Sequence, residues 1–133
     1  MPDTLQQSCD AIERCYEFLL AYAAQGLAGD AGAQSGAHLR IELGRAEAAI
    51  AGLRQAYDTA ISGLEPADRY AAFLAVLDRD AREALAAIQL VLAQPSISSQ
   101  LVDNLNASIH LRALLTDLFL IDEILKLRAR PSV

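Results

Sequence analysis

Three residues with acid–base side chains, Asp103, His110 and Asp117, follow one another at intervals of seven residues. In one continuous helix this spacing places all three on a single face, with Asn106 between the first two. A carboxylate can orient a histidine, and such a pair can transfer protons or help to bind a metal ion. Successive members are nevertheless about 10 Å apart along a helix axis, which is too far for direct contact. The spacing therefore favours a solvated polar face, and a small-ligand-binding or catalytic bundle anchored by His110 is the alternative hypothesis.

The other histidine, His38, lies in the segment Ala37-His38-Leu39-Arg40. This segment resembles the Ala-His-x-Leu-Lys-Gly signature of histidine phosphotransfer domains, which are small, acidic four-helix bundles. Here the basic residue follows the histidine by two positions rather than three, and no glycine follows it directly. The resemblance is confined to this short segment, and it implies a further alternative, histidine phosphotransfer through His38 or His110.

The two cysteines, Cys9 and Cys15, are six residues apart. In one helix they are separated by about 240° around the axis, so they cannot form a disulfide with each other without unwinding that helix. They do not form a Cys-x-x-Cys motif, and a zinc site would need a second pair. We expect structural roles for both, with Cys9 on the core face of the first helix and Cys15 nearer its flank.

Other cofactor and catalytic motifs are missing from the sequence. Neither histidine has a glutamate three residues before it, since Ser35 and Ala107 occupy those positions, so the Glu-x-x-His pairs of di-iron bundles are absent. The glycine-rich segment 26–36 lacks the spacing of a phosphate-binding loop, and no Gly-x-Ser-x-Gly motif occurs. We expect no cofactor and no metal, and we favour a non-enzymatic protein.

The composition is that of a single all-α domain over residues 1–133. Hydrophobic residues make up 53% of the chain and aromatic residues 5%, with many alanines and leucines that favour helices. The net charge of −6 disfavours nucleic acids and anionic membrane surfaces, both of which attract basic proteins. We see no signal peptide, and charges interrupt every apolar run before the ~20 residues of a membrane span. We expect a cytoplasmic protein that makes no membrane contact.

The apolar periodicity predicts a four-helix bundle with up-down-up-down topology. Helices are expected over residues 5–25, 37–62 and about 65–94, and a final helical segment runs to residue 127. Residues 26–36 form a flexible connection between the first two helices. In one straight helix, the final segment would place two apolar sets on roughly opposite faces: Leu101, Val102, Leu105 and Ile109 on one, and Leu114, Leu118 and Ile121 on the other. A break near residues 103–108 is therefore expected, because the segment contains weak helix formers.

The first and last helices carry more apolar surface than one core requires. Beside the core stripe of the last helix runs a second apolar row, and the first helix has a second row that includes Cys15. Large exposed apolar patches mark interaction sites, so these rows predict an interface; the alternative is that the last helix is the most buried helix of a monomer. The candidate interface residues are Phe18, Tyr22, Ala113, Leu120, Ile124 and Leu127.

The leading functional hypothesis is thus a helical-bundle protein that acts by association with other proteins. It forms a homo-oligomer, such as a homodimer through its first and last helices, or it is a chaperone-like adaptor that holds a partner helix in an apolar groove. Small bacterial secretion and flagellar chaperones are similar to this chain in size, charge and helicity alone.

Overall fold

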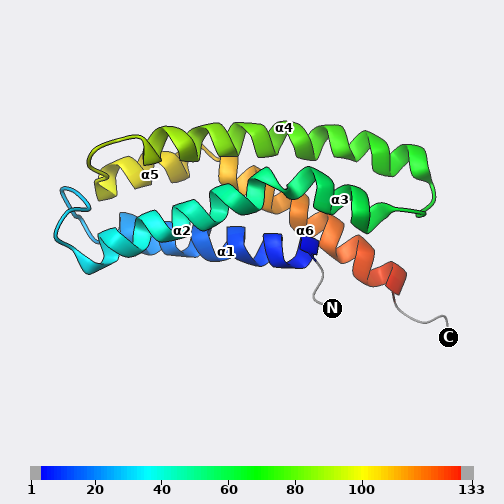
Figure 1. The fold of residues 1–133 in the computed structure, drawn as a ribbon, viewed down its shortest axis with the longest axis horizontal. Helices are drawn as coiled ribbons and strands as arrows, with labels where there is room; N and C mark the ends of the chain where they lie inside the picture. The colour runs from blue at the N-terminus through cyan, green and yellow to red at the C-terminus, as the bar shows by residue number, and fades with distance from the viewer. Residues whose placement is uncertain (1–3, 130–133) are drawn as a thin grey trace.

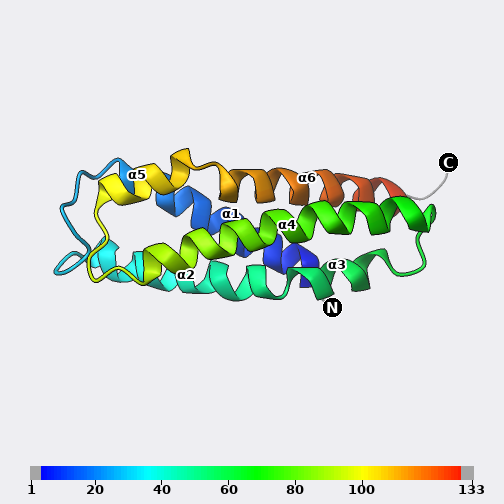
Figure 2. The same ribbon diagram turned by 90° about the horizontal axis from the view of Figure 1, so that it is seen from above.

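The computed structural model describes residues 4–129, and these residues form helices and no strand. The six helices are α1 (Thr4–Ala23), α2 (Gln34–Ala51), α3 (Leu53–Ile61), α4 (Ala67–Leu92), α5 (Ser99–Ala107) and α6 (His110–Ala129). They lie side by side along one long axis (Figure 1), and the view from above shows α5 and α6 following each other on one side of α4 (Figure 2). The all-α prediction is confirmed.

Two of the four expected helices are each divided into two. The helix expected over residues 37–62 is interrupted at Gly52, which ends α2 and precedes α3. A glycine inside a helix costs up to ~1 kcal/mol relative to alanine, so an interruption at this position is inexpensive. The first expected helix is found as α1, and the third is found as α4.

The expected break in the last segment lies at Ser108 and Ile109, between α5 and α6. Ile109 has a φ of 62°, in the left-handed region that β-branched residues rarely adopt. This turn changes the direction in which side chains point, so that Val102 of α5 and Leu114 of α6 are both buried in the same core. The turn therefore allows two apolar faces that would point in opposite directions on a straight helix to pack into one core. Ile109 itself, expected on the same face as Val102, is 59% exposed.

Buried tyrosine hydroxyl groups join distant parts of the core. The Tyr22 hydroxyl donates to the carbonyl oxygen of Ile97 at 2.7 Å, and the Tyr57 hydroxyl donates to that of Tyr70 at 2.8 Å. Ser99, at the start of α5, donates through Oγ to the Tyr22 carbonyl oxygen at 2.7 Å. Because buried polar groups are costly when unpaired, the bonds of Tyr22 and Ser99 fix the start of α5 against the end of α1, and the bond of Tyr57 joins α3 to the start of α4.

The connection between α1 and α2 is held by the carboxylate of Asp30. Oδ1 accepts from the Ile97 amide at 2.7 Å, and Oδ2 accepts from Arg40 Nε at 2.6 Å. Hydrogen bonding to Arg40 and to the Ile97 amide holds the pKa of Asp30 below its ordinary value. A Cβ at Gly36 would lie 2.0 Å from the Asp30 carbonyl oxygen, so only glycine fits there. The expected loop is present, but hydrogen bonds and close packing constrain it.

The left-handed turn at Ile109 leads to a stability prediction. A left-handed conformation costs a non-glycine residue ~1–2 kcal/mol, whereas glycine adopts it freely. We expect Ile109→Gly to unfold at higher urea concentration than Ile109→Ala, with a difference of about 1 kcal/mol in the free energy of unfolding. Both variants lack the exposed isoleucine side chain, so the comparison isolates the backbone.

The matched control is Ala107→Gly, two residues earlier and within α5. Here the same loss of a Cβ should destabilise the protein, by ~0.5–1 kcal/mol. If Ile109→Ala proved as stable as Ile109→Gly, the backbone at this position would not be strained.

Candidate interaction surface

The exposed side of α6 carries large apolar residues. Its inner side is buried, through Leu111, Leu114 and Leu118. Its opposite side, which we call the outer face of α6, consists of Arg112, Thr116, Phe119, Leu120, Glu123 and Leu127. Phe119, Leu120 and Leu127 are 46%, 52% and 53% exposed. Three large apolar side chains are thus exposed on the outer side of one helix, and exposed apolar surface is typical of sites that bind other proteins.

The residues predicted to form the interface differ in their exposure to solvent. Leu120 and Leu127 are exposed, whereas Ala113, Ile124 and Phe18 are partly buried. Tyr22 is fully buried and hydrogen-bonded to Ile97, so its side chain lies inside the protein.

Other large apolar residues are exposed that the sequence did not single out for the interface, and two of them lie beside the predicted surface. Leu20 of α1 is 48% exposed, and Phe119 of α6 is 46% exposed. Spacing alone could not rank these positions, because α1 has apolar residues on most of its sides.

The cysteines are both buried. Cys15, expected nearer the flank of its helix, is fully buried. Burial raises the pKa of the Cys15 thiol to about 12 and that of Cys9 to about 11. The thiolate is the reactive form, so both residues act as small hydrophobic core residues at neutral pH.

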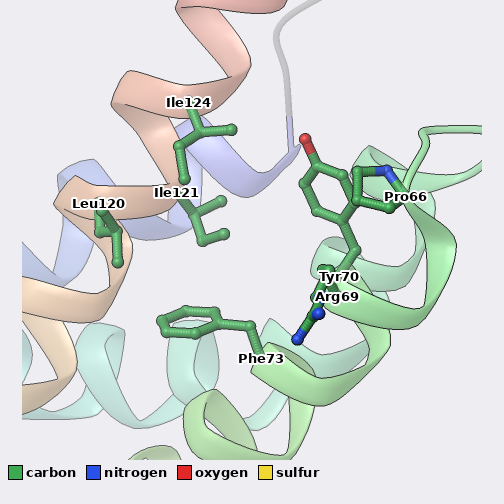
Figure 3. Close-up of a pocket in the computed structure, with 7 residues that line it drawn as sticks. All are labelled: Pro66, Arg69, Tyr70, Phe73, Leu120, Ile121 and Ile124. Atoms are coloured by element: carbon green, nitrogen blue, oxygen red, sulfur yellow. The ribbon is translucent and has the colours of Figure 1, made fainter.

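An apolar groove runs between the start of α4 and the second half of α6 (Figure 3). We call it the α4–α6 groove; its volume is about 270 Å³, and its lining residues are Pro66, Arg69, Tyr70, Phe73, Leu120, Ile121 and Ile124. In Figure 3, the side chains of α6 face those of α4 across an open space, with Phe73 at one end and the Tyr70 hydroxyl at the end nearer Ile124. Leu120 and Ile124, both predicted interface residues, thus line one hollow.

A second groove lies on the other side of α6, against α1. Its volume is about 310 Å³, and its lining residues are Glu13, Tyr16, Glu17, Leu20, Arg112, Leu115, Thr116 and Phe119. The exposed residues Leu20 and Phe119 both line it. The outer face of α6 is therefore a ridge between two hollows.

The two charged residues of the outer face, Arg112 and Glu123, are both exposed. Neither has an oppositely charged group within 4.0 Å among residues 4–129. They are eleven residues apart on α6, which is about 16 Å along the axis. They therefore cannot pair with each other within one molecule.

The proposed ligand anchor, Asp103, His110 and Asp117, is divided by the break at Ile109. Asp103 is exposed on α5. His110 Nδ1 lies 3.6 Å from Glu83 Oε2 of α4, so the nearest charged partner of this histidine is not one of the two aspartates. Asp117 pairs with Asp80 of α4. His110 and Asp117 of α6 thus each contact a carboxylate of α4. The seven-residue spacing within α6 could not predict these contacts between helices.

Asp117 and Asp80 are two carboxyl groups in contact between α4 and α6. Asp117 Oδ2 is buried, and no donor of the described residues reaches it. Burial, hydrogen bonding to Asp80 and the charge of Asp80 raise the pKa of Asp117 to about 7, although Arg79 opposes the shift. A proton on Asp117 satisfies both groups by donating to the Asp80 carboxylate.

His38 belongs to a cluster around a buried carboxylate. Glu42 is 1% exposed, and its Oε1 lies 3.3 Å from His38 Nε2, 3.2 Å from Arg45 NH1 and 3.6 Å from Arg14 Nε. The ring of Phe18 lies 4.8 Å from that of His38. The structure therefore gives His38 an orienting carboxylate, while phosphotransfer through His38 stays a prediction.

Three further findings bear on function. Within residues 4–129, no three His, Cys, Asp or Glu side chains are grouped so that they could hold a metal ion. None of the helices described is long and apolar enough to span a membrane. In comparisons with known proteins, no protein family, curated protein or solved structure matches the chain.

The Asp117–Asp80 pair predicts a pH dependence of stability. The pKa of Asp117 is about 7 in the folded protein, against an ordinary value of 3.8, so the folded state binds the proton more tightly. This contribution to stability is complete below pH ~4 and is lost as the pH rises through about 7. We expect Asp117→Asn, which keeps a donor toward Asp80, to be more stable than the wild type at pH 8 by on the order of 1–2 kcal/mol.

At pH 4, Asp117→Asn should be no more stable than the wild type. Urea unfolding at pH 8 and at pH 4 measures the free energy of unfolding of both proteins. Asp103→Asn, at an exposed position on α5, is the matched control and should shift stability equally at the two pH values. An advantage of Asp117→Asn that did not grow with pH would rule out the protonated pair.

Proposed function

We propose that this protein is an interaction protein whose outer face of α6 binds the same face of a second copy. The exposed side chains of Phe119, Leu120 and Leu127 support the proposal, since association would remove them from water. Apolar burial contributes ~25 cal/mol per Å², so this gain is the main driving force we invoke. In this proposal the chain is a four-segment, up-down-up-down bundle, in which α2 with α3, and α5 with α6, each serve as one segment.

The single observation that favours a second copy over another partner is the placement of Arg112 and Glu123. These opposite charges lie on either side of the apolar residues Phe119 and Leu120, and both are free of ion pairs among the described residues. When two copies of α6 pack antiparallel about a two-fold axis near residues 117 and 118, Arg112 of each copy faces Glu123 of the other. A two-fold axis repeats each contact, so the dimer would contain two ion pairs between Arg112 of one copy and Glu123 of the other.

The adaptor alternative has its own observation, the α4–α6 groove. Its volume of about 270 Å³ is lined mostly by apolar residues, and it fits one large apolar side chain of a partner helix. A partner helix would need to reach Phe73 and Ile121 within this groove, whereas a second copy would contact the outer face.

A charge-swap experiment tests the homodimer. Light scattering after size exclusion, over a range of concentrations, measures the dissociation constant of each variant. We expect Arg112→Glu and Glu123→Arg to weaken the dimer by about 10-fold each, because each change places like charges opposite one another at two positions. The double variant Arg112→Glu/Glu123→Arg should restore wild-type affinity, since the swapped charges again face each other.

The apolar contribution is measured in the same way. Leu120→Ser should weaken the dimer, whereas Leu90→Ser should leave it unchanged. Leu90 is the matched control because it is 66% exposed but lies at the other end of α4. A wild-type protein that is monomeric at every concentration, or a double variant as weak as the single ones, would overturn the proposal.

A further inference from the structure

Two arginine side chains without a carboxylate partner lie beside the apolar α4–α6 groove. The proposed homodimer does not involve either of them. Most arginines of this acidic protein lie near a carboxylate, as Arg54 and Arg82 lie near Asp78. Within residues 4–129, only Arg69, Arg112 and Arg128 have no carboxylate oxygen within 4.0 Å. Arg112 lies on the outer face of α6, and the other two lie at this groove.

Both of these arginines lie beside the groove. Arg69, in the first turn of α4, is one of the residues that line it. The Arg128 guanidinium lies 5.9 Å from the centre of the Tyr70 ring, which forms one wall of the groove. This distance is within the range of a cation–π contact, which holds the cation near the wall without neutralising it. The α4 N-terminus, with the positive end of its helix dipole, lies at the same place.

The other residues that line the groove are apolar, and their side chains surround one hollow. Phe73 closes one end, and Ile121 and Leu120 of α6 face Tyr70 across the hollow (Figure 3). The Tyr70 hydroxyl lies at the opposite end from Phe73 (Figure 3). An apolar hollow with a few polar groups at its edge is typical of small-molecule sites, which fix the orientation of a ligand through those groups.

We propose that the α4–α6 groove binds a small amphipathic anion, such as a medium-chain carboxylate. The apolar chain lies between Phe73, Leu120 and Ile121. The carboxylate lies at the end nearer Ile124, where the Tyr70 hydroxyl supplies a donor and Arg128 supplies positive charge. Arg69, whose side-chain nitrogens lie near Phe73 in Figure 3, adds positive charge from the other end of the groove. The cavity volume of about 270 Å³ suits a chain of modest length. The proposed homodimer shares Leu120 with this groove, but its charged contacts, Arg112 and Glu123, lie outside the groove on the outer face of α6.

Calorimetry with three eight-carbon probes tests the chemistry of the ligand. Octanoate, 1-octanol and octylammonium share one apolar chain and differ in charge. We expect octanoate to bind most tightly and octylammonium most weakly. In the series from hexanoate to dodecanoate, affinity should rise by about 4-fold per methylene until the groove is filled and should then level off.

Charge-removing variants test the role of the arginines. Arg128→Gln should weaken octanoate binding by about 5-fold, and Arg69→Gln, at the Phe73 end, should weaken it by less; both should leave 1-octanol binding unchanged. Arg112→Gln is the matched control, since it removes an unpaired arginine outside the groove and should leave octanoate binding intact. That variant also separates the two proposals, because it should weaken the dimer.

Methyl NMR spectra locate the bound chain. Octanoate should shift the signals of Ile121 and Ile124, which line the groove, and should leave those of Ile88 and Ile97 unchanged. Ile88 and Ile97 are buried at or beyond the other end of α4 and therefore serve as controls. Equal binding of octanoate and octylammonium, or shifts at the control residues alone, would overturn the proposal.

Discussion

The carboxylate of Asp30 is the interaction on which the arrangement of the other elements depends. It accepts from the Ile97 amide and from Arg40, and Arg40 also donates to the carbonyl oxygens of Leu92 and Gln94. One acidic side chain thereby joins the loop before α2, α2 itself and the connection that leaves α4. Because α5 starts directly after this connection, its starting position is fixed by the same group.

The position of α6 follows from that of α5 and from the turn at Ile109. The turn lets the apolar residues of both helices enter one core, although they would lie on opposite sides of a straight helix. Once the inner row of α6 is buried, its second apolar row has to face outward or toward α4. The outer face of α6 and the α4–α6 groove are therefore consequences of the same geometry that closes the core.

Local patterns predicted the parts of this structure that depend on local physics. The 3.6-residue periodicity predicted the all-α fold, and the conflict between two apolar faces predicted the break before α6. The second row of α6 predicted the exposure of Leu120 and Leu127.

The features that the sequence did not reveal depend on contacts between distant residues. Tyr22 is buried because its hydroxyl meets a carbonyl oxygen seventy-five residues away. Asp117 faces Asp80, and Glu42 meets Arg14, only because separate helices pack together. Periodicity assigns a residue to a face of its own helix, but it does not say which neighbour that face meets.

The eleven-residue interval between Arg112 and Glu123 also limits how large an assembly the outer face of α6 could build. Pairing about a two-fold axis uses the whole face of both molecules at once, so no copy of that face remains for a third molecule. A head-to-tail contact between two different surfaces would instead leave one of each free at the ends and could extend without limit. If the outer face of α6 associates as proposed, the opposite charges at its two ends therefore favour a finite pair over an open filament.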